Sequence, residues 1–157
     1  EWDGIEACIE NVVQKYQFPN VQLGLEITEQ DALSSSIDIT KKIEALKAKG
    51  HRFLIDDFGM GHTSLVYLQT KYFNIVKLDG SLTRDVIHNE TNRDIIASIV
   101  YLGRSLKFKI IAEYVENEAQ RDELKKLGCD AFQGYLYSKP IKLDELMSWI
   151  KGSGHES

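Results

Sequence analysis

The chain has 157 residues, of which 43% are hydrophobic and 27% are charged, a composition typical of one globular domain. Its net charge of −5 argues against non-specific binding of DNA or RNA, which normally requires a basic face. Two cysteines without a paired motif favour a reducing, cytoplasmic setting, and any membrane anchor is expected in regions of a parent protein outside this sequence.

The first part of the chain predicts an amphipathic helix that ends near residues 18–20, followed by a strand over 21–28 (VQLGLEIT). Ser34, Ser35 and Ser36 offer N-caps for a second helix, which ends at Gly50. A strand over 51–56 (HRFLID) and a short helix over 64–70 come next.

The second part begins with a strand over 73–79 (FNIVKLD). Thr91 or Asn92 is expected to cap a long helix, after which residues 109–113 (KIIAE) form a strand. Asn117 caps another helix that Gly128 closes, and residues 129–134 (CDAFQG) form a short strand. A last helix covers 143–150, and residues 151–157 read as a disordered tail.

Five predicted strands thus alternate with helices, which indicates an α/β fold with a parallel sheet built from βαβ units. The strands are almost continuously apolar, as expected when helices and a second layer cover both faces. No low-complexity linker interrupts residues 1–150, so this stretch is expected to be one domain.

Polar side chains gather where the predicted strands end. In parallel α/β architectures these ends share one side of the sheet, so residues far apart in sequence are expected to converge there. The residues concerned are Glu26, Asp56, Asp57, Lys77, Glu113 and Gln133.

Two adjacent carboxylates repel each other unless a cation lies nearby, and the single Lys77 cannot neutralise Glu26, Asp56, Asp57 and Glu113 together. A single acid at a strand end is more ambiguous, because it often caps a helix or lies in a solvated turn. For Glu29 and Glu116 the structural and the functional interpretation stay equally open.

Clustered carboxylate oxygens select hard divalent cations such as Mg²⁺ or Mn²⁺. Two such ions roughly 3.5–4 Å apart would suit a phosphodiester substrate, with Lys77 positioning water or offsetting charge on the phosphate. Gly59 and Gly61 would let the following loop bend over the site. Tyr135 and Tyr137 could stack on a nucleobase, although aromatic residues near a strand end more often serve packing.

The segments EITE, DDFGMGHTSL, KLDGSL, AEYVE and QGYLYSKP, in this order, resemble the motif series of the EAL domain family. That family comprises bacterial phosphodiesterases that act on cyclic di-GMP, and its fold is a modified TIM-type (β/α) barrel. The resemblance extends from about residue 18 to residue 150. It implies a metal-dependent hydrolase that converts cyclic di-GMP to linear pGpG.

The resemblance also implies roles for individual residues. Metal ligands are implied at Glu26, Asp56 and Asp57, with Asp56 shared between two ions, and the catalytic lysine is Lys77. Glu113 matches a metal ligand or base, and Gln133 matches a position near the substrate and its attacking water. Supporting roles are implied for Glu29, Gly59, Gly61 and Glu116.

The sequence departs from the family pattern in length and in several positions. A TIM-type barrel has about 250 residues, and neither the Glu-Ala-Leu segment nor the Asn-bearing strand after it is found among these 157. The chain therefore resembles the C-terminal two-thirds of such a domain, so activity of the fragment alone is uncertain. Met60, His62 and Tyr114 stand where Thr, Tyr and Gly are common.

Further expectations concern assembly, alternative functions and the parent protein. The open edges of a partial barrel, at 21–28 or 129–134, predict self-association into a homodimer or larger assembly. A catalytically silent EAL-type module that senses cyclic di-GMP or a protein is an alternative to the enzyme, and GGDEF or sensor domains are possible in the parent. A flavodoxin-like receiver is disfavoured, because its Asp pair follows the first strand and its Lys follows the last.

Overall fold

The computed structural model describes residues 4, 7–11, 24–28, 37–59, 72–142, 145, 146 and 149. The helix expected over 64–70 lies outside these residues, as do Glu29, Gly61 and most of the helix expected over 143–150.

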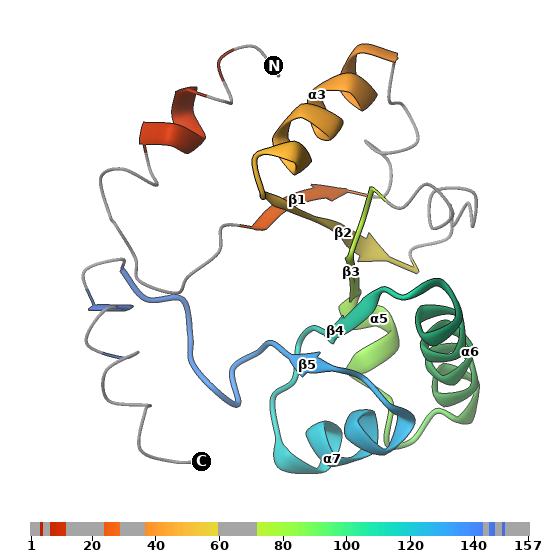
Figure 1. Ribbon diagram of the computed structural model, residues 1–157. Coiled ribbons are helices and arrows are strands. Elements are labelled where there is room, and N and C mark those ends of the chain that lie inside the picture. Colours follow the sequence, from red (N-terminus) through yellow and green to blue (C-terminus); the bar gives the residue numbers. More distant parts are fainter. Residues whose placement is uncertain are drawn as a thin grey trace.

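Five parallel strands form one sheet in which the order in space follows the order in the chain (Figure 1). They are β1 (Gly24–Thr28), β2 (Arg52–Phe58), β3 (Ile75–Leu78), β4 (Lys109–Ala112) and β5 (Ala131–Phe132). A flavodoxin-like receiver would place its first strand between two others, so the sequential order excludes that alternative. The predicted α/β class with alternating parallel strands is confirmed, and β1 and β5 are the two edges of the described sheet.

Four of the described helices have defined bounds: α3 (Ile37–Ala48), α5 (Gly80–Thr83), α6 (Glu90–Leu106) and α7 (Glu118–Leu127). Helix α3 packs against β2, while α6 packs against β4 and contacts α7 (Figure 1). None of the helices in the described ranges is long and apolar enough to cross a bilayer.

The cap of α6 differs from the prediction. Asn89, rather than Thr91 or Asn92, is the N-cap, and its side chain accepts a hydrogen bond from the backbone N–H of Asn92. The Asn92 amide instead donates to the carbonyls of Ser81 and Leu82, which ties α6 to α5. The predicted cap of α7 is confirmed, because Asn117 and Gln120 form a capping box, and Gly128 closes the helix in the left-handed conformation.

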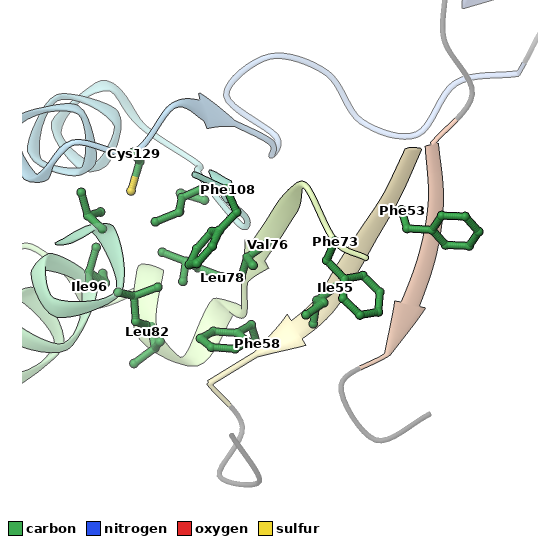
Figure 2. Packing of buried hydrophobic residues seen from close by; sticks show 14 of the residues in the cluster. Phe53, Ile55, Phe58, Phe73, Val76, Leu78, Leu82, Ile96, Phe108 and Cys129 are labelled. Atoms are coloured by element: carbon green, nitrogen blue, oxygen red, sulfur yellow. The ribbon is translucent and has the colours of Figure 1, made fainter. Parts of the chain in front are cut away.

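The two faces of the sheet have different roles. Because side chains alternate along a strand, the register places Phe53, Ile55, Val76 and Leu78 on one face, where they join the main hydrophobic core beneath the helices (Figure 2). The other face carries Leu54, which is also buried. The charged residues of β1 and β3 lie on this second face, opposite the helices.

Candidate functional site

Lys77 lies at the centre of the charged cluster, with its side chain only 4% exposed. Its Nζ atom lies 2.9 Å from Glu26 Oε2, 2.9 Å from Asp56 Oδ1 and 2.8 Å from Glu113 Oε1. These three carboxylates come from β1, from β2 and from the end of β4. The predicted convergence of acidic side chains from separate strands is therefore present.

The strand register explains this convergence. Thr28 lies opposite Asp56, so Glu26, two residues earlier, is on the same face of the sheet as Asp56. Lys77 lies opposite Ile111, and Glu113 follows Ile111 by two residues. All four charged residues consequently face the side of the sheet away from the main core.

A bulge in β2 makes two adjacent acids available to the site. Ile55 lies opposite Val76 and Phe58 lies opposite Leu78, so three residue steps on β2 match two on β3. Asp57, the extra residue, has a left-handed φ of 55°. The bulge returns Phe58 to the core, where it is 2% exposed, and leaves Asp57 exposed beside Asp56.

The oxygen atoms fit a divalent cation. One carboxylate oxygen from each of Asp56, Asp57 and Glu113 lies within 4.8 Å of the others. Asp56 Oδ1 is buried and accepts no hydrogen bond from the described residues, so its charge is met there only by the ion pair with Lys77. A cluster of hard carboxylate oxygens, one of them buried, is the donor set that Mg²⁺, Mn²⁺ or Ca²⁺ accepts.

The electrostatics of the cluster follow from burial and charge. Burial alone would lower the pKa of Lys77, but its contacts with Glu113, Asp56 and Glu26 together raise that pKa above its ordinary value. Burial raises the pKa of Glu113, Lys77 opposes this rise, and the Asp56 and Glu26 carboxylates add to it. Lys77 is thus a permanent cation, while Glu113 binds a proton more readily than an exposed glutamate.

A pocket of about 430 Å³ opens beside this cluster, with Glu113 in its wall. The pocket combines acids, an amide, an arginine and two aromatic rings. It is lined by Arg84, Glu113, Tyr114, Glu116, Gln133, Gly134 and Tyr135. Its size is within the range of small-molecule sites, which is about 300–1,000 Å³.

Backbone contacts hold the segment that carries Glu113. The hydroxyl of Thr83, a residue that is 1% exposed, donates to the carbonyl of Glu113. Gly134 lies so close to Val115 that a Cβ atom at this glycine would clash with the Val115 carbonyl oxygen. Only glycine fits this position, so the pocket wall between the ends of β4 and β5 is tightly constrained.

Comparison with known proteins decides the family. A family model described as "EAL domain" matches residues 3–140, which is most of the chain.

The chain belongs to the EAL domain family.

Among the relatives of this EAL chain is the bifunctional diguanylate cyclase/cyclic di-GMP phosphodiesterase MucR of Pseudomonas aeruginosa. The two are 34% identical over 147 residues, which cover 94% of this chain and 22% of MucR. The chain spans about a fifth of the length of the first curated relatives it matches, with shares of 22% and 19%.

Solved EAL structures resemble the chain closely. The PaMucR phosphodiesterase in complex with c-di-GMP has a TM-score of 0.80 and 34% identity, covering 92% of this chain and 59% of that one. A manganese/cy-diGMP complex of Klebsiella pneumoniae BlrP1 has a TM-score of 0.78 and 28% identity, covering 89% of this chain and 36% of that one. These EAL neighbours support the TIM-barrel-like fold predicted for the chain.

The EAL site residues predicted from sequence fall into three groups. Lys77 contacts Glu26, Asp56 and Glu113, and Asp57 lies with Asp56 and Glu113 in the oxygen cluster. Glu116 and Gln133 line the adjoining pocket instead. Gly59 follows β2 with a φ of 107°, and Glu29 and Gly61 lie outside the described residues.

Sequence reasoning missed Arg84 and Thr83. Both follow β3 by only a few residues, but no motif or periodicity distinguishes them from surface residues of a short helix. Tyr135 was considered for base stacking and lines the pocket, whereas Tyr137, considered with it, does not appear in its lining.

Proposed function

We propose that this chain contributes the metal-binding and catalytic core of a phosphodiesterase that hydrolyses cyclic di-GMP to linear pGpG. The observation that carries the proposal is the meeting of carboxylates from three strands around Lys77, at 2.8–2.9 Å. The names of the relative MucR and of the PaMucR complex support cyclic di-GMP as the substrate.

Asp56, Asp57 and Glu113 would hold Mg²⁺ or Mn²⁺, with Glu26 as a further ligand; manganese accompanies cy-diGMP in the BlrP1 complex. Bound ions of this kind polarise phosphoryl oxygens and lower the pKa of a bound water. Glu26 is joined to the other acids through Lys77, so this carboxylate also helps to hold the lysine in place.

Lys77 supplies a fixed positive charge among the carboxylates, on the face of the sheet away from the main core. There it offsets negative charge that develops on the phosphate. The Glu113 carboxylate lies both in the oxygen cluster and in the pocket wall, so it would serve either as a metal ligand or as the base that takes a proton from the attacking water. Gln133 and Glu116 lie in the wall of the pocket next to Glu113, where they orient water and substrate. By the family resemblance, Gly59, Gly61 and Glu29 would support the loop after β2.

The parent protein carries additional domains of the GGDEF or sensor type and works in the cytoplasm. The additional domains are supported by the small share of the relatives that the chain spans and by the diguanylate cyclase activity in the name of MucR. The cytoplasmic location rests on the two cysteines without a paired motif. Edge strands β1 and β5 provide surfaces for self-association of the isolated chain. The net charge of −5 argues against a nucleic acid partner.

The test uses the full-length parent protein with Mg²⁺ or Mn²⁺, cyclic di-GMP as substrate, and chromatography to detect pGpG. We expect turnover that falls at least about 100-fold in Lys77→Met, since loss of a group that stabilises charge in the transition state costs this much. Lys49→Met, which removes an exposed lysine paired with Glu10, should retain full activity. Tight binding without pGpG would instead establish the silent sensor.

A further inference from the structure

Tyr114 occupies a backbone conformation that its side chain does not favour. Its φ is 55°, in the left-handed region, where a bulky residue is uncommon and costs free energy. The residue lies between buried Glu113 and buried Val115, and Val115 donates its N–H to the carbonyl of Gln133. A strained tyrosine next to a charged site is a reason to ask what its side chain does.

The Tyr114 ring lies on two residues of the turn that α5 forms. A Cβ atom at Gly80 would be 2.5 Å from the ring atom Cδ2, so the ring packs directly on the glycine backbone. The Arg84 guanidinium lies 4.1 Å from the ring centroid, which is a cation–π contact. This support holds the ring in one place although 45% of the residue is exposed.

Arg84 is itself held at its backbone. Gln120, which is 7% exposed, donates from Nε2 to the carbonyl of Arg84 and accepts the N–H of Glu116 at Oε1. No hydrogen bond or ion pair of the Arg84 side chain is found with any residue in the described ranges, and Arg84 lines the pocket, so its N–H donors are available to a ligand there. The Tyr114–Arg84 pair is therefore rigid, exposed and partly unsatisfied.

Tyr114 and Arg84 both line the 430 Å³ pocket. Glu113 lines the same pocket and also belongs to the acidic cluster. A flat aromatic surface with an arginine at its edge suits a nucleobase, because bases stack on tyrosine and arginine planes. Arginine also donates to O6 and N7 of guanine, and the carboxylate of Glu116, which lines the same pocket, offers an acceptor for guanine N–H groups.

We infer that Tyr114, supported by Gly80 and Arg84, is a specificity-determining residue that stacks on one guanine base of the substrate. The inference rests on the proposed function for the identity of the ligand, but it assigns a role that the metal cluster does not require. The strained backbone keeps the ring beside Glu113, so a base on the ring places its phosphate near the acidic cluster.

The experiment compares two matched variants in the full-length protein, Tyr114→Leu and Tyr137→Leu. Both tyrosines are 45% exposed, but only Tyr114 lines the pocket. We expect Tyr114→Leu to raise the KM for cyclic di-GMP about tenfold with kcat nearly unchanged, because base stacking contributes binding in both the ground state and the transition state. Tyr137→Leu should leave KM unchanged, and Tyr114→Phe should retain wild-type KM.

A second variant separates binding from folding. Tyr114→Gly suits a φ of 55° and should not lower Tm, yet it should raise KM as much as Tyr114→Leu does. An unchanged KM in Tyr114→Gly, or an equal rise in Tyr137→Leu, would overturn the inference.

A separate readout distinguishes this inference from the proposed function. If the wild-type protein produced no pGpG, the phosphodiesterase proposal would fail. The role of Tyr114 would then be decided by calorimetry, which measures the dissociation constant of cyclic di-GMP in the presence of Ca²⁺. A tenfold weaker affinity in Tyr114→Gly supports the stacking role, and an equal affinity overturns it.

Discussion

Lys77 Nζ on β3 lies 2.9 Å from Asp56 Oδ1 on β2, a buried oxygen that accepts no hydrogen bond from the described residues. The same ammonium group also contacts Glu26 and Glu113, so one cation holds three carboxylates together. Under the proposed function, a bound divalent cation would share with Lys77 the neutralisation of these acids.

Replacing Lys77 should destabilise the protein strongly in the absence of metal. Lys77→Met leaves three carboxylates without their counterion, and removing one partner of a buried ion pair costs about 3–5 kcal/mol. We expect the urea midpoint to fall in EDTA and to recover in part with Mn²⁺, measured by circular dichroism. Lys49→Met should change the unfolding free energy by less than about 0.5 kcal/mol, because exposed pairs contribute little. Equal midpoints for Lys77→Met and wild type would contradict the counterion role.

Asp57 should separate metal binding from stability. Asp57→Gly removes a carboxylate from the oxygen cluster but suits the left-handed φ of 55°, so Mn²⁺ affinity should fall while Tm stays at or above the wild-type value. Asp57→Ala should lose the same affinity and be about 1 kcal/mol less stable than Asp57→Gly. Calorimetric titration with Mn²⁺ and thermal unfolding measure the two effects. If both variants bound Mn²⁺ like wild type, Asp57 would not be a ligand.

Thr83 should stabilise the Glu113 segment through its hydroxyl. Thr83→Val keeps the volume but leaves the buried carbonyl of Glu113 without this donor, which costs about 1–3 kcal/mol. Thr83→Ser keeps the hydroxyl and serves as the matched control. Chemical unfolding of both variants tests this, and an unfolding free energy for Thr83→Val equal to that of Thr83→Ser would show that the hydrogen bond contributes nothing.

Asp79 should make stability depend on pH. Burial alone would raise its pKa, but hydrogen bonds from Ser81 and Gly80 and the charge of Arg84 lower the pKa below its ordinary value. A carboxylate whose folded-state pKa is depressed stabilises the fold above its unfolded-state pKa, and this contribution is lost as pH falls through the folded-state pKa. Asp79→Asn keeps a side-chain oxygen that can accept the cap hydrogen bond. The difference in unfolding free energy between wild type and Asp79→Asn therefore measures the contribution of the charge.

We expect wild type to exceed Asp79→Asn by about 0.5 kcal/mol at pH 7, as for a charge at a helix N-terminus, and by progressively less below pH 4. Urea unfolding at pH 7, 5 and 3 measures the difference. A gap that widened on acidification would reverse the sign and refute the assignment.

The chain-order sheet and the convergence of acids were predictable, because strand polarity and the positions of Glu26, Asp56 and Glu113 are visible in the sequence. The bulge in β2 was not, since the FLIDDF segment is compatible with regular alternation, and only the pairing with β3 shows that Phe58 returns to the core. Strand lengths were also overestimated at the last strand, which spans only Ala131–Phe132.

The helix caps likewise include one that the sequence predicts and one that depends on tertiary contacts. Asn117 was predictable because its partner Gln120 follows at the spacing of a capping box. For α6, three polar residues compete near the helix start, and the choice of Asn89 depends on contacts between Asn92 and α5, which lie beyond any local pattern. The Tyr114–Arg84 contact joins residues 30 positions apart through side-chain geometry, for which sequence offers no signal.

The extra residue in β2 bears on why the strand carries two adjacent aspartates, Asp56 and Asp57. Without one of the two aspartates, Phe58 would follow Ile55 by two residues, and simple alternation would keep both side chains on the core face. The packing of Phe58 therefore does not require the second aspartate. The inserted residue instead adds a second carboxylate to the oxygen cluster while leaving the apolar contacts of Phe58 in place.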